Sequence, residues 1–119
     1  SYEGEFDVIG FFDCLHDLGD PVGAAKYANQ KLKHGGTIML IEPSASDNPE
    51  DNFNTIGQMY YCFSTMACVP ASKSQEVGLA LGAQAGPAKL FKILEESGFA
   101  KIKIAHQNAS NMVIEATKP

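Results

Sequence analysis

Short apolar runs alternate along the chain with segments in which apolar residues recur every three or four positions. The first run, Phe6–Phe12, is rich in β-branched and aromatic residues, which predicts a strand buried on both faces. Thr37–Glu42 predicts a second strand of the same kind. Between them, Asp20 and Pro21 are suited to begin a helix, and Gly35–Gly36 to end it. Its expected apolar face consists of Val22, Ala25, Ala28 and Leu32.

The order strand, helix, strand with short connections predicts a βαβ unit with two parallel strands. The polar segment Pro43–Asn54 then predicts a loop. An amphipathic helix is expected after it, from apolar residues spaced at i, i+3, i+4 and i+7: Ile56, Met59, Tyr60, Phe63 and Met66 or Ala67. Val69–Gly86 is richer in small and polar residues and predicts a loop with a short turn or helix.

The last part of the chain predicts a helix followed by a β-hairpin. Gly86–Pro87 begins the helix, Gly98 ends it, and its apolar face is Leu90, Phe91 and Leu94. Lys101–His106 alternates polar and apolar residues, with Ile102 and Ile104 on one side, as in a strand with one solvated face. A short turn then makes Met112–Ala116 its antiparallel partner. We treat 1–119 as a single domain with segments 1–43, 44–86 and 87–119.

Composition limits the classes of function. The 119 residues carry a net charge of −5 and no basic run, which argues against nucleic-acid binding. No apolar stretch has membrane-spanning length and no secretory signal is visible, so we expect no membrane partner. Cys14, Cys62 and Cys68 form no metal-type pair and are expected as free thiols in the cytoplasm. No set of residues predicts a metal site, and His34 and His106 are expected at the surface.

Polar residues follow both predicted parallel strands at their carboxyl ends, where open α/β sheets bind ligands. Asp13 could contact a ligand, or cap a helix or turn. His16 could act as a base or orient a substrate, since its ordinary pKa is about 6.5, or it could bond a loop carbonyl. Glu42 could face a substrate, or cap Ser44 and the following amides. Asp17 adjoins His16, but neighbouring side chains need not meet, so no dyad is predicted.

The order and spacing of three motifs carry a resemblance. D-x-L-H-D-x-x-D-P spans Asp13–Pro21, L-K-x-G-G-T-x-x-x-x-E-P spans Leu32–Pro43, and L-G-A-Q-A-G spans Leu81–Gly86. From about Phe6 to its end, the chain resembles the C-terminal half of class I S-adenosylmethionine-dependent methyltransferases. The resemblance implies an α/β, Rossmann-like sheet: a parallel βαβ unit, a helical lid insertion, a helix and a terminal antiparallel hairpin. The last strand would insert between its neighbours.

The resemblance also implies roles for particular residues. Phe12, Asp13 and Cys14 would lie against the cofactor, S-adenosylmethionine. His16 and Glu42 are the catalytic candidates. The helical insertion would cover a small-molecule acceptor through an aromatic and thioether-rich surface, with Met59, Tyr60 and Phe63 as substrate-binding candidates beside Tyr61 and Met66. Alternatively, about half of these residues pack that helix on the core.

The half of the fold that mainly holds the cofactor has no counterpart in these residues. Class I methyltransferases carry a glycine-rich loop after the first strand and an acidic residue after the second. Gly78–Gly82 is no substitute, because it does not follow a buried strand and open a helix. We therefore expect this chain alone to bind S-adenosylmethionine weakly or not at all. A fragment of a longer enzyme and a natural truncated product both fit this pattern.

Phe6–Phe12 has no second neighbouring strand in the sequence, and an unpaired apolar edge recruits another chain. We therefore expect a homo-oligomer formed through this strand. Two functions remain open: a methyltransferase catalytic half, and a non-catalytic methyltransferase-like module that dimerises or binds a partner. A nucleotide-binding regulator has no phosphate loop to support it.

Overall fold

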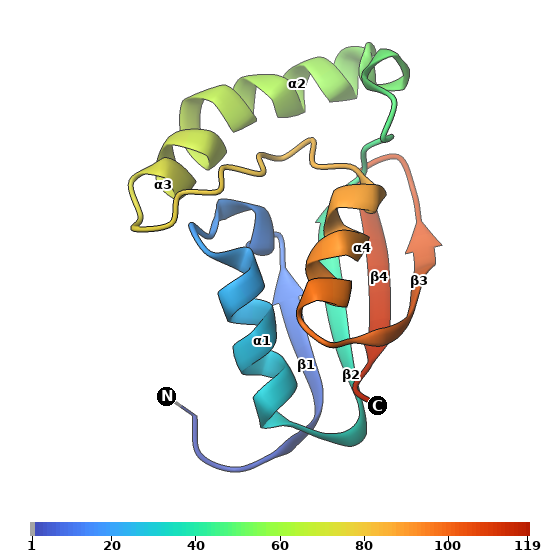
Figure 1. The fold of residues 1–119 in the computed structure, drawn as a ribbon. Coiled ribbons are helices and arrows are strands. Elements are labelled where there is room, and N and C mark those ends of the chain that lie inside the picture. The colour runs from blue at the N-terminus through green and yellow to red at the C-terminus, as the bar shows by residue number, and fades with distance from the viewer. Residues whose placement is uncertain (1) are drawn as a thin grey trace.

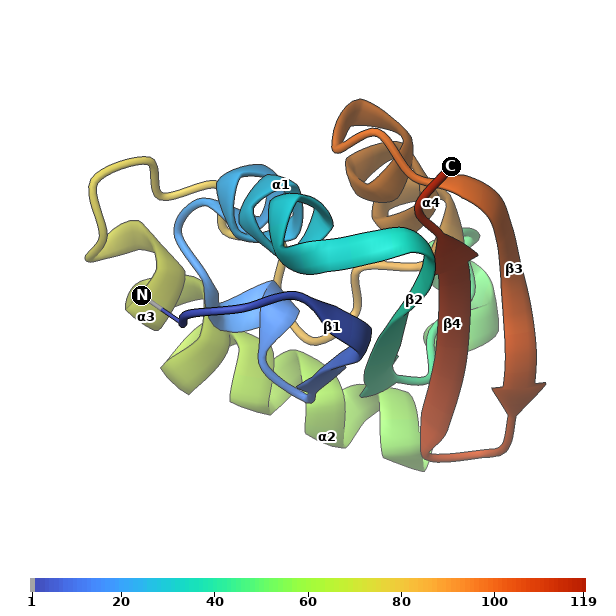
Figure 2. The ribbon, with the colours of Figure 1, turned by 90° about the horizontal axis from the view of Figure 1, so that it is seen from below.

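The computed structural model describes residues 2–119 and contains one sheet of four strands in the order β1-β2-β4-β3 (Figure 1). The strands are β1 (Phe6–Phe12), β2 (Leu32–Pro43), β3 (Ala100–Gln107) and β4 (Asn111–Thr117). Two helices, α1 (Pro21–Lys31) and α4 (Pro87–Glu96), lie side by side on one face of this sheet (Figures 1 and 2). A second helical segment lies across the carboxyl ends of β1 and β2: α2 (Thr55–Phe63), the π-helical turn η3 (Ser64–Cys68) and α3 (Val69–Lys73).

The strand pairing confirms the predicted topology. β1 is parallel to β2, with Ile9 opposite Ile38 and Phe12 opposite Ile41. β4 is antiparallel to both of its neighbours, and it lies between β2 and β3 although β3 precedes it in the chain. The molecule is thus a parallel βαβ unit extended by an inserted hairpin, which is the fold class expected from the sequence.

Helix α1 begins as predicted and ends earlier. The Asp20 carboxylate accepts a hydrogen bond from the Gly23 N–H at 2.8 Å, and Pro21 occupies the first turn. The predicted end at Gly35–Gly36 is wrong, because the backbone is already extended at Leu32, where β2 starts. The two glycines instead lie within β2, where the Gly35 N–H donates to Lys118 O and Gly36 O accepts from the Lys118 N–H, each at 2.9 Å.

The hydrophobic core lies between the sheet and the helices α1 and α4. Alternate residues of β2 and β4 point into it, as the period of two in a strand requires. The largest side chains that are fully buried there are Leu15, Leu32, Ile38, Leu40, Leu90, Leu94, Met112 and Ile114.

The expectation that β1 is buried on both faces is wrong. Phe6, Val8 and Phe12 are 37%, 59% and 63% exposed, whereas Ile9 and Phe11 pack against the core. The reason is that α1 covers one face of β1 only, and β1 is an edge strand with β2 as its sole neighbour among residues 2–119. The predicted unpaired edge is confirmed.

The predicted amphipathic helix is present, but its packing on the core is not. Met59, Phe63 and Met66 are 49%, 54% and 81% exposed, and no residue of α2 belongs to the core. The irregular segment 74–86 runs between this helix and the rest of the fold (Figure 1). Its Leu81 makes the core contact that the helix was expected to make. The short helix predicted within Val69–Gly86 is α3.

β3 is the second edge strand, and it is more exposed than its alternating pattern predicts. Ile102 packs against the core, but Ile104 is 39% exposed. The pairing with β4 shifts register on either side of these residues, and Lys101 has a positive φ of 53°. Ile104 lies opposite the buried Ile114 and so on the core side of the sheet, but β3 is an edge strand and leaves it partly open to solvent. Across residues 2–119, no helix combines the length and the apolar character needed to cross a membrane.

Candidate functional site

The carboxyl ends of β1 and β2 bring His16 and Glu42 into contact. The Asp13 N–H donates to Ile41 O at 2.7 Å, which keeps the chain beside β2 as it leaves β1. The short 3₁₀ turn η1 (Leu15–Asp17) then lies over Glu42. His16 Nδ1 lies 2.5 Å from Glu42 Oε2, and the Leu15 N–H donates to Oε1 at 3.0 Å. Both carboxylate oxygens of Glu42 are therefore engaged by η1.

This contact excludes the two structural alternatives that the sequence left open for Glu42 and His16. Glu42 does not cap the amide of Ser44, whose N–H donates instead to Ser110 O at 2.9 Å. His16 is bonded to a carboxylate rather than to a loop carbonyl. Both side chains are buried, with exposed fractions of 5% for His16 and 2% for Glu42. Because both groups are buried, removing either one would leave the other without a partner where little water can replace it.

The second ring nitrogen of His16 also faces a carboxylate. Nε2 lies 3.3 Å from Asp17 Oδ1, so the two neighbouring side chains do meet, contrary to expectation. Burial alone would lower the pKa of His16, but the Glu42 hydrogen bond and the charges of Glu42, Asp17 and Asp13 outweigh it. The pKa of His16 is consequently raised above its ordinary value of 6.5.

The raised pKa predicts how stability depends on pH. Because the folded chain holds the His16 proton more tightly than the unfolded chain, this group stabilises the fold fully below 6.5. The contribution is lost as the pH rises through the higher pKa of the folded state. Urea unfolding of the parent chain and of His16→Asn, measured from below pH 6.5 upward, should show this loss of stability in the parent chain alone. An equal pH dependence in both proteins would contradict the assignment.

Four of the predicted site residues line one pocket of about 260 Å³. Its wall consists of Asp13, His16, Pro43, Tyr60, Phe63, Cys68, Ala83 and Asn111. Glu42 lies behind His16 rather than in the wall. Met59, Phe12 and Cys14 do not line it, and Cys14 faces a separate groove beside β1.

Asn111 is a site residue that the sequence did not reveal. Its Nδ2 group donates to Asp13 Oδ1 at 3.0 Å and approaches Glu42 O at 3.4 Å, so it joins β4 to the ends of β1 and β2. The neighbouring Ser110 O accepts from the Tyr60 hydroxyl at 2.9 Å, which ties α2 to the same edge. The only sequence signal there was the turn-forming composition of residues 108–111, and such a composition does not predict a long-range contact.

Cys68 is a second residue whose place sequence spacing could not show. The π-helical turn η3 brings it to His16 and Asp17, and a ligand atom from each of the three side chains lies within 4.8 Å of the others. Burial of the thiol, and then the Asp17 carboxylate beside it, raise the pKa of Cys68 to about 11. Cys68 is therefore a protonated thiol at neutral pH, beside His16 and Asp17.

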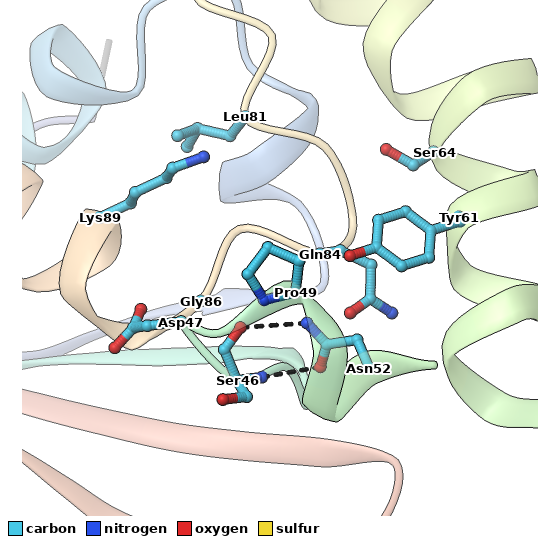
Figure 3. Close-up of a pocket in the computed structure, with 10 residues that line it drawn as sticks. All are labelled: Ser46, Asp47, Pro49, Asn52, Tyr61, Ser64, Leu81, Gln84, Gly86 and Lys89. Atoms are coloured by element: carbon cyan, nitrogen blue, oxygen red, sulfur yellow. Dashed lines mark hydrogen bonds between the residues drawn. The ribbon is translucent and has the colours of Figure 1, made fainter. Parts of the chain in front are cut away.

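A separate polar pocket of about 260 Å³ lies between α2, α4 and the short turn η2 (Pro49–Asn52) (Figure 3). One wall is fixed by two hydrogen bonds: Ser46 N–H donates to Asn52 Oδ1 at 2.9 Å, and Asn52 Nδ2 donates to Ser46 O at 3.0 Å. The Gln84 amide lies in this pocket, and both its oxygen and its nitrogen are buried without a hydrogen-bond partner. This pocket contains none of the residues predicted for catalysis.

The orphaned amide gives a prediction on stability. Gln84→Met keeps the length of the side chain and removes two unpaired polar atoms, so we expect the free energy of unfolding to rise by about 1 kcal/mol. Thermal unfolding measures it, with Gln58→Met on the exposed side of α2 as the control. A loss of stability of that size would show instead that the amide has a partner in solution.

Neither a family model nor a curated protein sequence matches the chain. Solved structures do. The pyocyanin biosynthetic protein PhzM has a TM-score of 0.70 and 15% identity, over 98% of this chain and 32% of that one. Human N-acetylserotonin methyltransferase, solved with SAM, has a TM-score of 0.67 and 21% identity, over 98% of this chain and 30% of that one. An O-methyltransferase family protein from Burkholderia thailandensis has a TM-score of 0.67 and 16% identity, over 97% of this chain and 31% of that one.

At these identities the likeness concerns the fold. The chain has the fold of the C-terminal part of a class I methyltransferase, and it spans about a third of the length of the chains it matches.

Proposed function

We propose that this chain provides the acceptor-binding side of an S-adenosylmethionine-dependent methyltransferase that acts on a small molecule. The observation that carries the proposal is His16, fixed by a buried carboxylate on Nδ1 while its ring lines a pocket with Tyr60 and Phe63. The structural neighbours support the cofactor: one was solved with SAM and another, PigF, with SAH.

The chemistry of the pocket follows from the Glu42 contact. An ionised Glu42 accepts a hydrogen bond from Nδ1–H, so the neutral ring keeps its lone pair on Nε2, as in catalytic triads. Nε2 would then take a proton from an acceptor hydroxyl or amine. Tyr60 and Phe63 offer aromatic surfaces for a flat or apolar acceptor, and Asn111 holds Asp13 at the same edge. The site is suited to position an acceptor and to accept its proton.

The cofactor does not fit the residues of this chain alone. Phe12 and Cys14 at the end of β1 could contact only part of it, and the 119 residues contain no glycine-rich loop between a strand and a helix. Isothermal titration of S-adenosylmethionine into the chain is therefore expected to show no saturable heat at micromolar concentrations. Micromolar affinity would overturn this part of the proposal.

Substitution of His16 tests the proposed base. In a preparation that transfers methyl groups from S-adenosylmethionine, His16→Asn should lower kcat by about 10²- to 10⁴-fold. Because the base must be neutral and its pKa is raised, kcat should increase with pH through a value above 6.5. The control is His106→Asn on the exposed strand β3. Equal activity of the two variants would exclude His16 as the base.

The alternative is a non-catalytic module that pairs through β1. It is supported by the exposed edge of that strand and by an apolar groove of about 560 Å³ beside it, lined by residues such as Phe6, Val8 and Tyr27. We propose a second copy of this chain as the partner at this edge. This proposal is independent of catalysis, because the edge and the His16 pocket are different surfaces.

A further inference from the structure

Three side chains that bind transition metals converge beside the proposed base. His16, Asp17 and Cys68 each offer a ligand atom, and these atoms lie within 4.8 Å of one another. Tetrahedral zinc has ligand distances of about 2.0–2.3 Å, so its ligands lie about 3.3–3.8 Å apart. The three side chains would close on an ion by small rotations. Their imidazole, carboxylate and thiol groups are the set that zinc prefers.

Two features of the site are independent of this proximity. First, the Glu42 carboxylate bonds His16 Nδ1, so Nε2 is the ring nitrogen available to a metal. Carboxylates hold metal-ligating histidines in this way and increase their basicity. Second, Asp17 Oδ1 is buried and has no well-oriented hydrogen-bond partner, although it lies 3.3 Å from His16 Nε2. A buried lone pair of this kind is costly unless something binds it.

We propose that His16, Asp17 and Cys68 form a site for a divalent metal ion of the Zn²⁺ type, and that the ion blocks the proposed base. His16 and Cys68 also line the 260 Å³ pocket, so a fourth position on the ion would face that pocket. Binding displaces a proton from the Cys68 thiol and occupies the Nε2 lone pair. The bound ion therefore inhibits methyl transfer, an effect that rests on the proposed function. Metal binding itself does not depend on that function.

Cobalt is the probe, because a thiolate bound to Co²⁺ gives a charge-transfer absorption in the near ultraviolet that oxygen and nitrogen ligands do not. Co²⁺ is titrated into the reduced chain, and Zn²⁺ is then added to displace it. We expect the absorption to saturate at one equivalent and to disappear with Zn²⁺. Because the thiol must lose a proton, the affinity should increase with pH.

Matched variants locate the ion. Cys68→Ser should abolish the thiolate absorption and weaken binding at least tenfold, whereas Cys62→Ser, which removes an exposed cysteine of α2, should change neither. Glu42→Gln should weaken binding by about 10- to 100-fold through the histidine it orients. Circular dichroism checks that each variant is folded. If one is not, Asp17→Asn, which changes a partly exposed side chain of the same site, is measured in its place.

The outcomes separate this inference from the proposed function. Absence of saturable cobalt absorption, or its loss in Cys62→Ser rather than in Cys68→Ser, overturns the metal site. A metal site that behaves as described in a chain without methyl-transfer activity leaves the inference standing and counts against the proposed function alone.

Discussion

Glu42→Ala is expected to lower the free energy of unfolding by about 3–5 kcal/mol, the usual loss when one partner of a buried charged pair is removed. The carboxylate is 2% exposed and accepts bonds from both His16 Nδ1 and the Leu15 N–H. Its removal leaves two buried donors unpaired where β1 and β2 end. Small domains are stable by about 5–15 kcal/mol, so this loss is a large fraction of the total stability and raises the fraction of unfolded molecules at room temperature. Urea unfolding followed by circular dichroism measures the change.

The chain offers a matched control for this prediction. Glu115 on β4 pairs with Lys103 on β3 at 2.8 Å, and their side chains are 38% and 66% exposed to solvent. Such a solvent-accessible pair contributes at most about 1 kcal/mol, so Glu115→Ala should change little. Glu42→Gln keeps an oxygen for the Leu15 N–H and should lose less than Glu42→Ala. Similar losses for Glu42→Ala and Glu115→Ala would contradict the picture of a buried carboxylate that joins η1 to β2.

That His16 and Glu42 lie at the same edge of the sheet could be predicted from topology, although their hydrogen bond could not. Parallel strands joined by one helix end at the same edge of the sheet, and residues just beyond those ends must meet there. The apolar runs and their short connections were enough to establish that order. The hairpin of β3 and β4 was predictable for the same reason, since a short turn between two strands leaves few alternatives.

The remaining features depend on contacts between distant segments. The apolar character of Phe6, Val8 and Phe12 resembles that of a buried strand, but burial depends on a covering layer, which the pattern of one strand cannot reveal. The aromatic face of α2 presents the same problem, because segment 74–86 separates it from the core. Asn111 and Cys68 enter the site through a turn and a π-helical turn. Neither carries a sequence signal that specifies its partner.

The open edge of β1 has a defined set of donors. Along a strand the backbone N–H groups point alternately to one side and the other. Since the Asp13 N–H donates to Ile41 O of β2, the N–H groups of Phe11 and Ile9 also point toward β2. Those of Val8, Gly10 and Phe12 therefore point to the open edge. These three N–H groups are the donors that the edge offers to a second copy.

Val8→Pro is expected to weaken self-association through β1 without disturbing the pairing of β1 with β2. Proline removes the outward N–H of an edge residue, which is the strand position that tolerates it. Each copy loses a hydrogen bond worth about 1 kcal/mol, and a two-fold dimer loses two, so the dissociation constant should increase about 30-fold. Sedimentation equilibrium at tens of micromolar measures it, with Val8→Thr, which keeps the N–H and the branched shape, as the control. If the parent chain is a monomer at these concentrations, or if threonine weakens association as much as proline does, the exposed edge of β1 is not where two copies meet.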